Sequence, residues 1–207
     1  MVLDKELLKL AKYKLGVFDL SQPITDEELA SIDELSINNL SFSGQVKNVD
    51  LTQLSQFIGL QRLDLTNFDI GETFAKAISG LQQLESLTIS KGSLRAPIEN
   101  ESVEQIILKS CDVKDYGYLP STEALDMYEQ NVDISQMQNQ IDKMKDFSLF
   151  GGSLKKSRRL TEMTKLENVY VVGAKIDDRS TIEALKNHGV RVEVDLEKRN
   201  IDTLFKA

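Results

Sequence analysis

The residue types that most often carry out catalysis are scarce in this chain, which has one histidine, His188, and one cysteine, Cys111. A histidine could serve as a general base, and a thiolate as a nucleophile. His188, however, stands beside Gly189 at the end of a predicted helix, where it suits a capping or surface role. Cys111 falls on a position that the repeat pattern described below directs toward a core.

Motifs for other kinds of chemistry do not occur either. The sequence has no Gly-x-Ser-x-Gly, no Gly-rich phosphate loop and no Cys/His spacing typical of a metal site. We therefore expect a protein that is not an enzyme, with no catalytic residues, no cofactor and no metal.

The charged residues point to a class of partner. The formal net charge is −8, which argues against nucleic acid or an anionic membrane as the partner. An acidic surface suits a basic protein, and it also serves solubility alone. One basic group, Lys155, Lys156, Arg158 and Arg159, interrupts the acidic surface. We expect it to be a solvated loop; the alternative is a site for an acidic or phosphate-bearing partner.

A short pattern, apolar-x-x-apolar-x-apolar, recurs along the chain. It predicts the elements that position the histidine, the cysteine and the charged residues. Its middle apolar residue returns every 19 to 28 residues, at Leu35, Leu63, Leu87, Ile106, Leu125, Phe147, Val169 and Val190. A strand pattern with a period of about 20–29 residues is typical of leucine-rich repeats. We predict an α/β leucine-rich-repeat solenoid of about eight irregular repeats. One curved parallel sheet should form the concave face, with helices or 3-10 turns on the convex face.

The segment before the first strand predicts a helical cap. In ITDEELASIDELSI, which begins at Ile24, Thr25 and Glu28 form a capping box. This segment resembles the N-terminal cap and first repeat of bacterial internalin-type leucine-rich-repeat proteins. Because a solenoid has open apolar ends, we predict a helical N-terminal cap over residues 1–31, repeats over 32–195 and a C-terminal cap over 196–207. The family places Asn or Cys five residues after each middle apolar residue, and here Cys111 alone conforms, so the repeats are degenerate and lack an asparagine ladder.

The candidate binding residues lie between the repeated apolar positions. Strand alternation directs them to the concave face, where the first repeats offer small polar groups. The later repeats offer apolar and aromatic side chains, rimmed by carboxylates that would steer a basic partner. The predicted partner-binding residues are Ile107, Asp126, Tyr128, Glu129, Phe150, Glu167, Tyr170 and Val172. The alternative is a register slip of one residue, which would bury the aromatic side chains instead.

These features favour a protein-protein interaction module that binds its partner on the concave face. One concrete form is a stoichiometric inhibitor, an immunity protein that neutralises a bacterial toxin; the alternative is an adaptor or scaffold that recruits a partner without inhibiting it. Charged residues interrupt the first 20 residues, no membrane-spanning stretch occurs, and one cysteine permits no intrachain disulfide. We expect a cytoplasmic protein, monomeric when free, that binds neither nucleic acid nor membrane.

Overall fold

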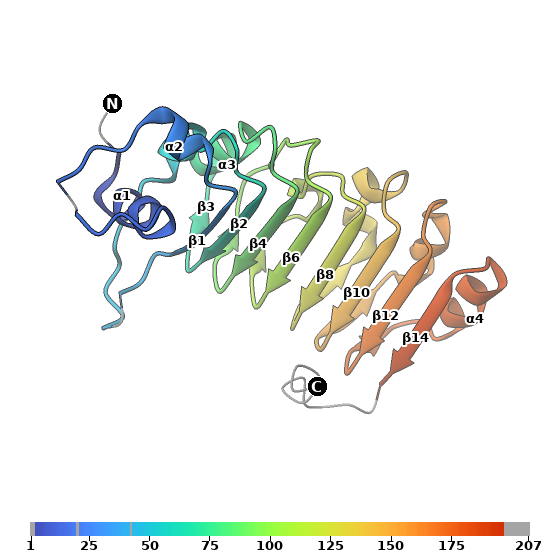
Figure 1. Cartoon of the computed structure of the whole chain (residues 1–207). Helices are drawn as coiled ribbons and strands as arrows, with labels where there is room; N and C mark the ends of the chain where they lie inside the picture. Colours follow the sequence, from blue (N-terminus) through green and yellow to red (C-terminus); the bar gives the residue numbers. More distant parts are fainter. Residues whose placement is uncertain (1–2, 20, 42, 197–207) are drawn as a thin grey trace.

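The computed structural model describes residues 3–19, 21–41 and 43–196. The strands of one parallel sheet recur along the chain from Glu34 to Asp195 (Figure 1). Its eight strands follow one another in sequence order, so each repeat adds one strand beside the last. They are β1 (Glu34–Asn38), β2 (Arg62–Thr66), β4 (Ser86–Ser90), β6 (Gln105–Lys109), β8 (Ala124–Tyr128), β10 (Asp146–Phe150), β12 (Asn168–Val172) and β14 (Arg191–Asp195). The predicted leucine-rich-repeat solenoid is confirmed.

The register of the sheet matches the repeat pattern in every repeat but the last. Leu35 pairs with Leu63 and Phe147 with Val169, each middle apolar residue facing the next. Val169, however, pairs with Val192, so the assignment of Val190 as the last middle residue was wrong. The cause is that side chains alternate with a period of two, so a shift of two residues keeps every side chain on its face.

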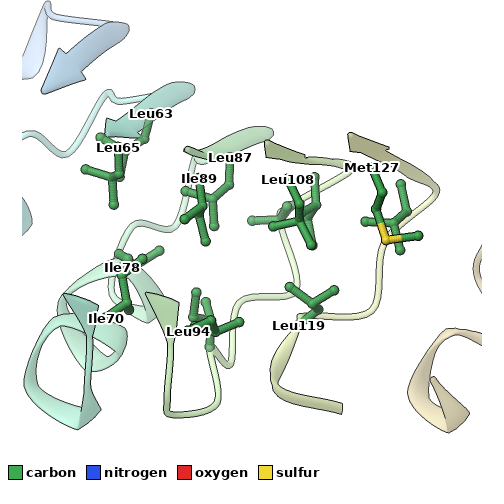
Figure 2. Close-up of a cluster of buried hydrophobic side chains, with 14 of the residues drawn as sticks. Leu63, Leu65, Ile70, Ile78, Leu87, Ile89, Leu94, Leu108, Leu119 and Met127 are labelled. Carbon is green, nitrogen blue, oxygen red and sulfur yellow. The ribbon is translucent and has the colours of Figure 1, made fainter. Parts of the chain in front are cut away.

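The core lies between the sheet and the convex returns of the chain. Figure 2 shows side chains from successive strands above side chains from the convex segments: Leu63, Leu65, Leu87, Ile89, Leu108 and Met127 from strands, and Ile70, Ile78, Leu94 and Leu119 from the convex segments. Each of these side chains is at most 1% exposed. Burying a leucine or isoleucine contributes about 1.5–3 kcal/mol, and the repetition fixes each strand against its neighbours.

The convex side combines helices, 3-10 turns and short strands. The helices are α3 (Glu72–Ser79) and α4 (Ser180–Asn187), and the 3-10 turns are η1 (Leu51–Gln56), η2 (Tyr116–Tyr118), η3 (Ile134–Gln136), η4 (Gln138–Gln140) and η5 (Ser157–Glu162). Two small parallel sheets, absent from the sequence prediction, are formed by β3 (Asp69–Ile70), β5 (Ser93–Leu94) and β7 (Asp112–Val113), and by β9 (Asn131–Asp133), β11 (Ser153–Lys155) and β13 (Lys175–Ile176). Strands of two or three residues are too short to show alternation.

Two helices precede the first strand, and the second begins at the predicted capping box. α2 (Asp26–Ala30) begins with reciprocal bonds: the Glu28 N–H donates to Thr25 Oγ1 at 3.1 Å, and the Thr25 N–H donates to Glu28 Oε2 at 2.8 Å. α1 (Lys5–Lys14) places Leu7 and Ala11 in the core, both 0% exposed. They cover the apolar end of the solenoid. Of the predicted C-terminal cap, residues 197–207 lie outside the described part of the chain, so that cap stays a prediction.

A backbone ladder replaces the missing asparagine ladder where the strands end. The residue after each of six strands has a positive φ, between 49° and 75°: Asn67, Lys91, Ser110, Glu129, Gly151 and Gly173. The Asn67 N–H donates to the Ser90 carbonyl at 2.9 Å, and the Glu129 N–H donates to the Phe150 carbonyl at 2.7 Å. Cys111 adds a side-chain bond, its Sγ donating to the Ile89 carbonyl at 2.8 Å. The turns are thus satisfied mainly by backbone groups.

Candidate functional site

The concave face carries three columns of side chains, which the in-register pairing defines. The first column is Glu34, Arg62, Ser86, Gln105, Ala124, Asp146, Asn168 and Arg191. The central column is Ser36, Asp64, Thr88, Ile107, Asp126, Ser148, Tyr170 and Glu193. The third column is Asn38, Thr66, Ser90, Lys109, Tyr128, Phe150, Val172 and Asp195. Neighbours within a column lie on adjacent strands, about 4.8 Å apart.

The structure excludes the one-residue slip that would have buried the aromatic residues. Leu125, Phe147 and Val169 point into the core and are at most 1% exposed. Tyr128, Phe150 and Tyr170 lie on the opposite face and are half-buried. The predicted aromatic side chains are therefore part of the concave surface.

Three side chains of the third column form a continuous stack across β6, β8 and β10. The rings of Tyr128 and Phe150 are stacked, with centroids 4.9 Å apart and an interplanar angle of 15°. The Lys109 ammonium lies over the Tyr128 ring, 5.7 Å from its centroid. Burial, and to a lesser degree the charge of Asp126, raises the pKa of the Tyr128 phenol above its ordinary value. An aromatic pair is worth about 0.5–1.5 kcal/mol beyond its burial, which holds both rings in place.

The two aliphatic residues of the predicted site differ in exposure. Ile107 is half-buried beside Asp126 in the central column. Val172 is only 7% exposed, so its prediction as an accessible contact residue was wrong. Its column neighbours are Phe150 and Asp195, whose longer side chains flank the smaller valine on both adjacent strands.

The predicted carboxylates lie in the middle and at both edges of the aromatic region. Asp126 is in the central column and accepts a bond from Gln105 Nε2 at 3.0 Å. Glu129 follows β8 and accepts from Ser110 Oγ at 2.9 Å. Glu167 immediately precedes β12 and is exposed. Within residues 3–19, 21–41 and 43–196, none of these three carboxylates forms a salt bridge.

Two further carboxylates belong to this region and were missed from the sequence. Glu193 lies beside Tyr170 in the central column, where the sequence register had placed Arg191. Asp146 lies in the first column and accepts a bond from Asn168 Nδ2 at 2.6 Å. The uninterrupted alternation Val190, Val192, Val194 was the one signal that could have suggested the shifted register.

The residues considered for catalysis have structural surroundings. His188 is the exposed C-cap of α4. Burial raises the pKa of the Cys111 thiol, which opposes formation of a thiolate. The described residues hold no group of three or more His, Cys, Asp or Glu side chains that could bind a metal ion. In the same part of the chain, no helix is long and apolar enough to cross a bilayer.

The basic group lies on the convex side and is partly neutralised by its neighbours. Arg159 Nε lies 3.2 Å from Glu162 Oε2, and Arg158 Nη1 lies 3.9 Å from Asp178 Oδ2. The Lys156 side chain is exposed beside them. These local ion pairs favour the solvated-loop interpretation over a site for an acidic partner.

Comparisons with known proteins concern the fold. No protein-family model and no curated protein sequence matches this chain. The solved structure of internalin C2 from Listeria monocytogenes is similar, with a TM-score of 0.54 and 16% identity over 92% of this chain and 93% of that one. An internalin F from the same species gives a TM-score of 0.47 and 18% identity over 93% and 69%. The chain therefore has the leucine-rich-repeat fold, similar to that of internalin C2.

Proposed function

We propose that this protein binds another protein through the aromatic half of its concave surface. The observation that carries the proposal is the stacked pair Tyr128–Phe150 on adjacent strands, with Tyr170 on the next strand. Aromatic side chains held rigidly and half-exposed within a polar surface are the composition of a binding hot spot. The same face in the first repeats offers Ser36, Thr66 and other small polar groups, so the aromatic character is local.

The electrostatics of this region support a basic partner. Asp126, Glu129 and Glu167 surround the aromatic residues, and within the described residues neither they nor Glu193 form a salt bridge. At the other end of the face, by contrast, Glu34 is paired with Arg62. Unpaired carboxylates around an apolar centre attract a positively charged protein and repel an acidic one.

The finer role that we propose is stoichiometric inhibition of a basic toxin, as an immunity protein in the cytoplasm. A broad sheet that presents aromatic side chains together with carboxylates can bind over the basic active site of a toxin and block access to it. The second candidate is an adaptor, which would bind through the same residues and leave the partner active. Adding one equivalent of this protein to the purified partner separates the two: an inhibitor abolishes the partner's activity, whereas an adaptor leaves it unchanged.

Partner binding is tested by removing the aromatic side chains together. A partner recovered by affinity capture is purified and its binding is remeasured by calorimetry with the triple variant Tyr128→Ala, Phe150→Ala and Tyr170→Ala. Loss of hot-spot side chains worth about 2 kcal/mol or more should weaken binding at least about 30-fold. The control replaces Ser36, Thr66 and Ser90 by Ala in the same columns of earlier repeats and should bind normally. Unchanged affinity of a folded aromatic triple variant would overturn the proposal.

A further inference from the structure

We propose that the partner contacts the central column with two cationic side chains placed on either side of an apolar one, and that Asp126 and Glu193 receive the two cations. This inference rests on the proposed binding function and deepens it by naming the chemistry of the bound segment. It depends on the corrected register of β14, which brings Glu193 onto the same column as Asp126 and Tyr170.

The two carboxylates bracket the aromatic region. From Asp126, the central column continues through Ser148 and Tyr170 to Glu193. The two ends are three strands apart, so their backbones are separated by about 14 Å. Glu193 is exposed, and Asp126 is half-buried with a neutral hydrogen-bond donor, Gln105. Neither carboxylate is neutralised by a salt bridge within the described chain.

The protein itself shows that this aromatic region accommodates a cation. The Lys109 ammonium lies over the Tyr128 ring at 5.7 Å from its centroid, a favourable cation–π distance. The column neighbours of Tyr170 are Ser148 and Glu193, one neutral and one acidic. A guanidinium or ammonium brought by a partner would therefore meet an aromatic face and a carboxylate at the same place, an arrangement that suits arginine in particular.

The spacing predicts how such a segment is built. In an extended chain, residues i, i+2 and i+4 point to one side, and the outer two are about 13–14 Å apart. This length matches the separation of Asp126 from Glu193. A segment lying across β8 to β14 would place its middle side chain near Phe150 and Tyr170, which supply the apolar surface. Arg191 lies in the first column, two residues before Glu193, and would repel a cation placed on that side.

The test uses short peptides as probes of the full chain. The first is acetyl-Gly-Arg-Ala-Leu-Ala-Arg-Gly-amide, and two matched peptides carry Gln or Glu at both Arg positions. We expect the Arg peptide to shift the NMR resonances of Tyr170 and Phe150 and to bind at least tenfold more tightly than the Gln peptide, with no shifts from the Glu peptide. Glu193→Lys should weaken Arg-peptide binding at least tenfold. Glu183→Lys makes the same charge change on α4, on the convex side, and should leave binding unchanged.

Two outcomes would overturn the inference: equal binding of the Arg and Gln peptides, or equal effects of Glu193→Lys and Glu183→Lys. The fate of the proposed function is decided separately with the purified partner. If the aromatic triple variant loses that partner while Asp126→Asn with Glu193→Gln binds it normally, binding at the concave face stands and the two-cation segment is wrong.

Discussion

Gly152 and Gly189 show how the same backbone conformation can carry different constraints. Both have positive φ, +75° and +83°, in a region that favours glycine. A Cβ on Gly152 would lie 1.9 Å from the Gln130 carbonyl oxygen, whereas a Cβ on Gly189 would meet no atom within 4 Å. The Gln130 carbonyl also accepts a hydrogen bond from the Ser153 N–H at 2.9 Å, so it cannot move without breaking this bond between neighbouring repeats.

We expect Gly152→Ala to lower the free energy of unfolding by about 3 kcal/mol or more, because steric overlap adds to backbone strain. Gly189→Ala, which adds strain alone, should cost about 1–2 kcal/mol. Urea denaturation monitored by circular dichroism measures both values. Equal losses in the two variants would show that the close approach to Gln130 relaxes without cost.

Tyr116 supplies a prediction about pH. Burial, followed by the nearby charges of Cys111 and Asp112, raises the pKa of its phenol to about 12, against about 10 in an unfolded chain. Because the folded-state pKa is the higher one, this group contributes stability that is complete below about pH 10 and is lost as the pH rises toward 12. Tyr116→Phe should therefore lose less stability than the wild type between pH 9 and pH 11.

The measurement is the urea midpoint across that pH range, with Tyr13→Phe as the matched control. Tyr13 is 75% exposed, so its replacement should leave the alkaline loss as large as in the wild type. If Tyr116→Phe and the wild type lose stability in parallel, the Tyr116 phenol does not contribute to the pH dependence.

At the scale of elements, buried polar side chains join the convex returns of neighbouring repeats. Gln140 is 0% exposed, and both ends of its amide are bonded: Oε1 accepts the Thr122 N–H at 2.9 Å, and Nε2 donates to the Pro120 carbonyl at 2.7 Å. Asn100 acts similarly two repeats earlier, donating to the Ile78 and Leu81 carbonyls at 3.0 and 2.9 Å. These bonds satisfy buried backbone groups of the preceding return, including carbonyls at the end of α3.

Replacing Gln140 with Leu should leave two buried backbone groups without a partner and cost about 2–4 kcal/mol. Hydrogen exchange of the Thr122 amide, followed by NMR, should become faster by the factor that corresponds to this loss of free energy. Gln138→Leu, at an exposed position of the same 3-10 turn, is the control and should change neither quantity. Slow exchange at Thr122 in the Gln140 variant would mean that its N–H has another acceptor.

The elements also show what sequence periodicity can and cannot predict. The strands centred on Leu63 or Phe147 follow from alternation because one face must be buried. The capping box of Thr25 and Glu28 follows from local hydrogen bonding alone. The short strands of the two small convex sheets, β3, β5 and β7 and β9, β11 and β13, depend on pairing between repeats, and no local pattern in the sequence marks them. The register of β14 escaped prediction because Val190, Val192 and Val194 alternate without interruption.

At the scale of the whole molecule, the regular stacking of repeats turns a pattern in sequence into a pattern in space. Because the register stays constant from β1 to β12, the aromatic residues of the later repeats must lie side by side, and this part of the site was predictable. The covering of Val172 and the stack of Tyr128 on Phe150 depend on side-chain packing and were not. Glu193 depended on the one strand whose register was shifted.

The division between aromatic centre and acidic edges predicts separate effects on the kinetics of partner binding. Glu129 follows the end of β8 and Glu167 precedes the start of β12, so they lie beyond opposite ends of the strands, where charges act over distance and are screened by salt. Glu129→Gln with Glu167→Gln should slow association several-fold at low ionic strength and flatten its dependence on salt, with little change in dissociation. Tyr128→Ala should instead speed dissociation, because it removes buried contact area.

Surface plasmon resonance with the purified partner at several salt concentrations measures both rates. Glu72→Gln with Glu183→Gln, in the convex helices α3 and α4, makes the same change in net charge and is the control. If the convex and concave pairs slow association equally, attraction depends on net charge alone. If Tyr128→Ala slows association and leaves dissociation unchanged, the aromatic residues act during encounter and not as anchors of the complex, because an anchor is lost only when the bound partner leaves.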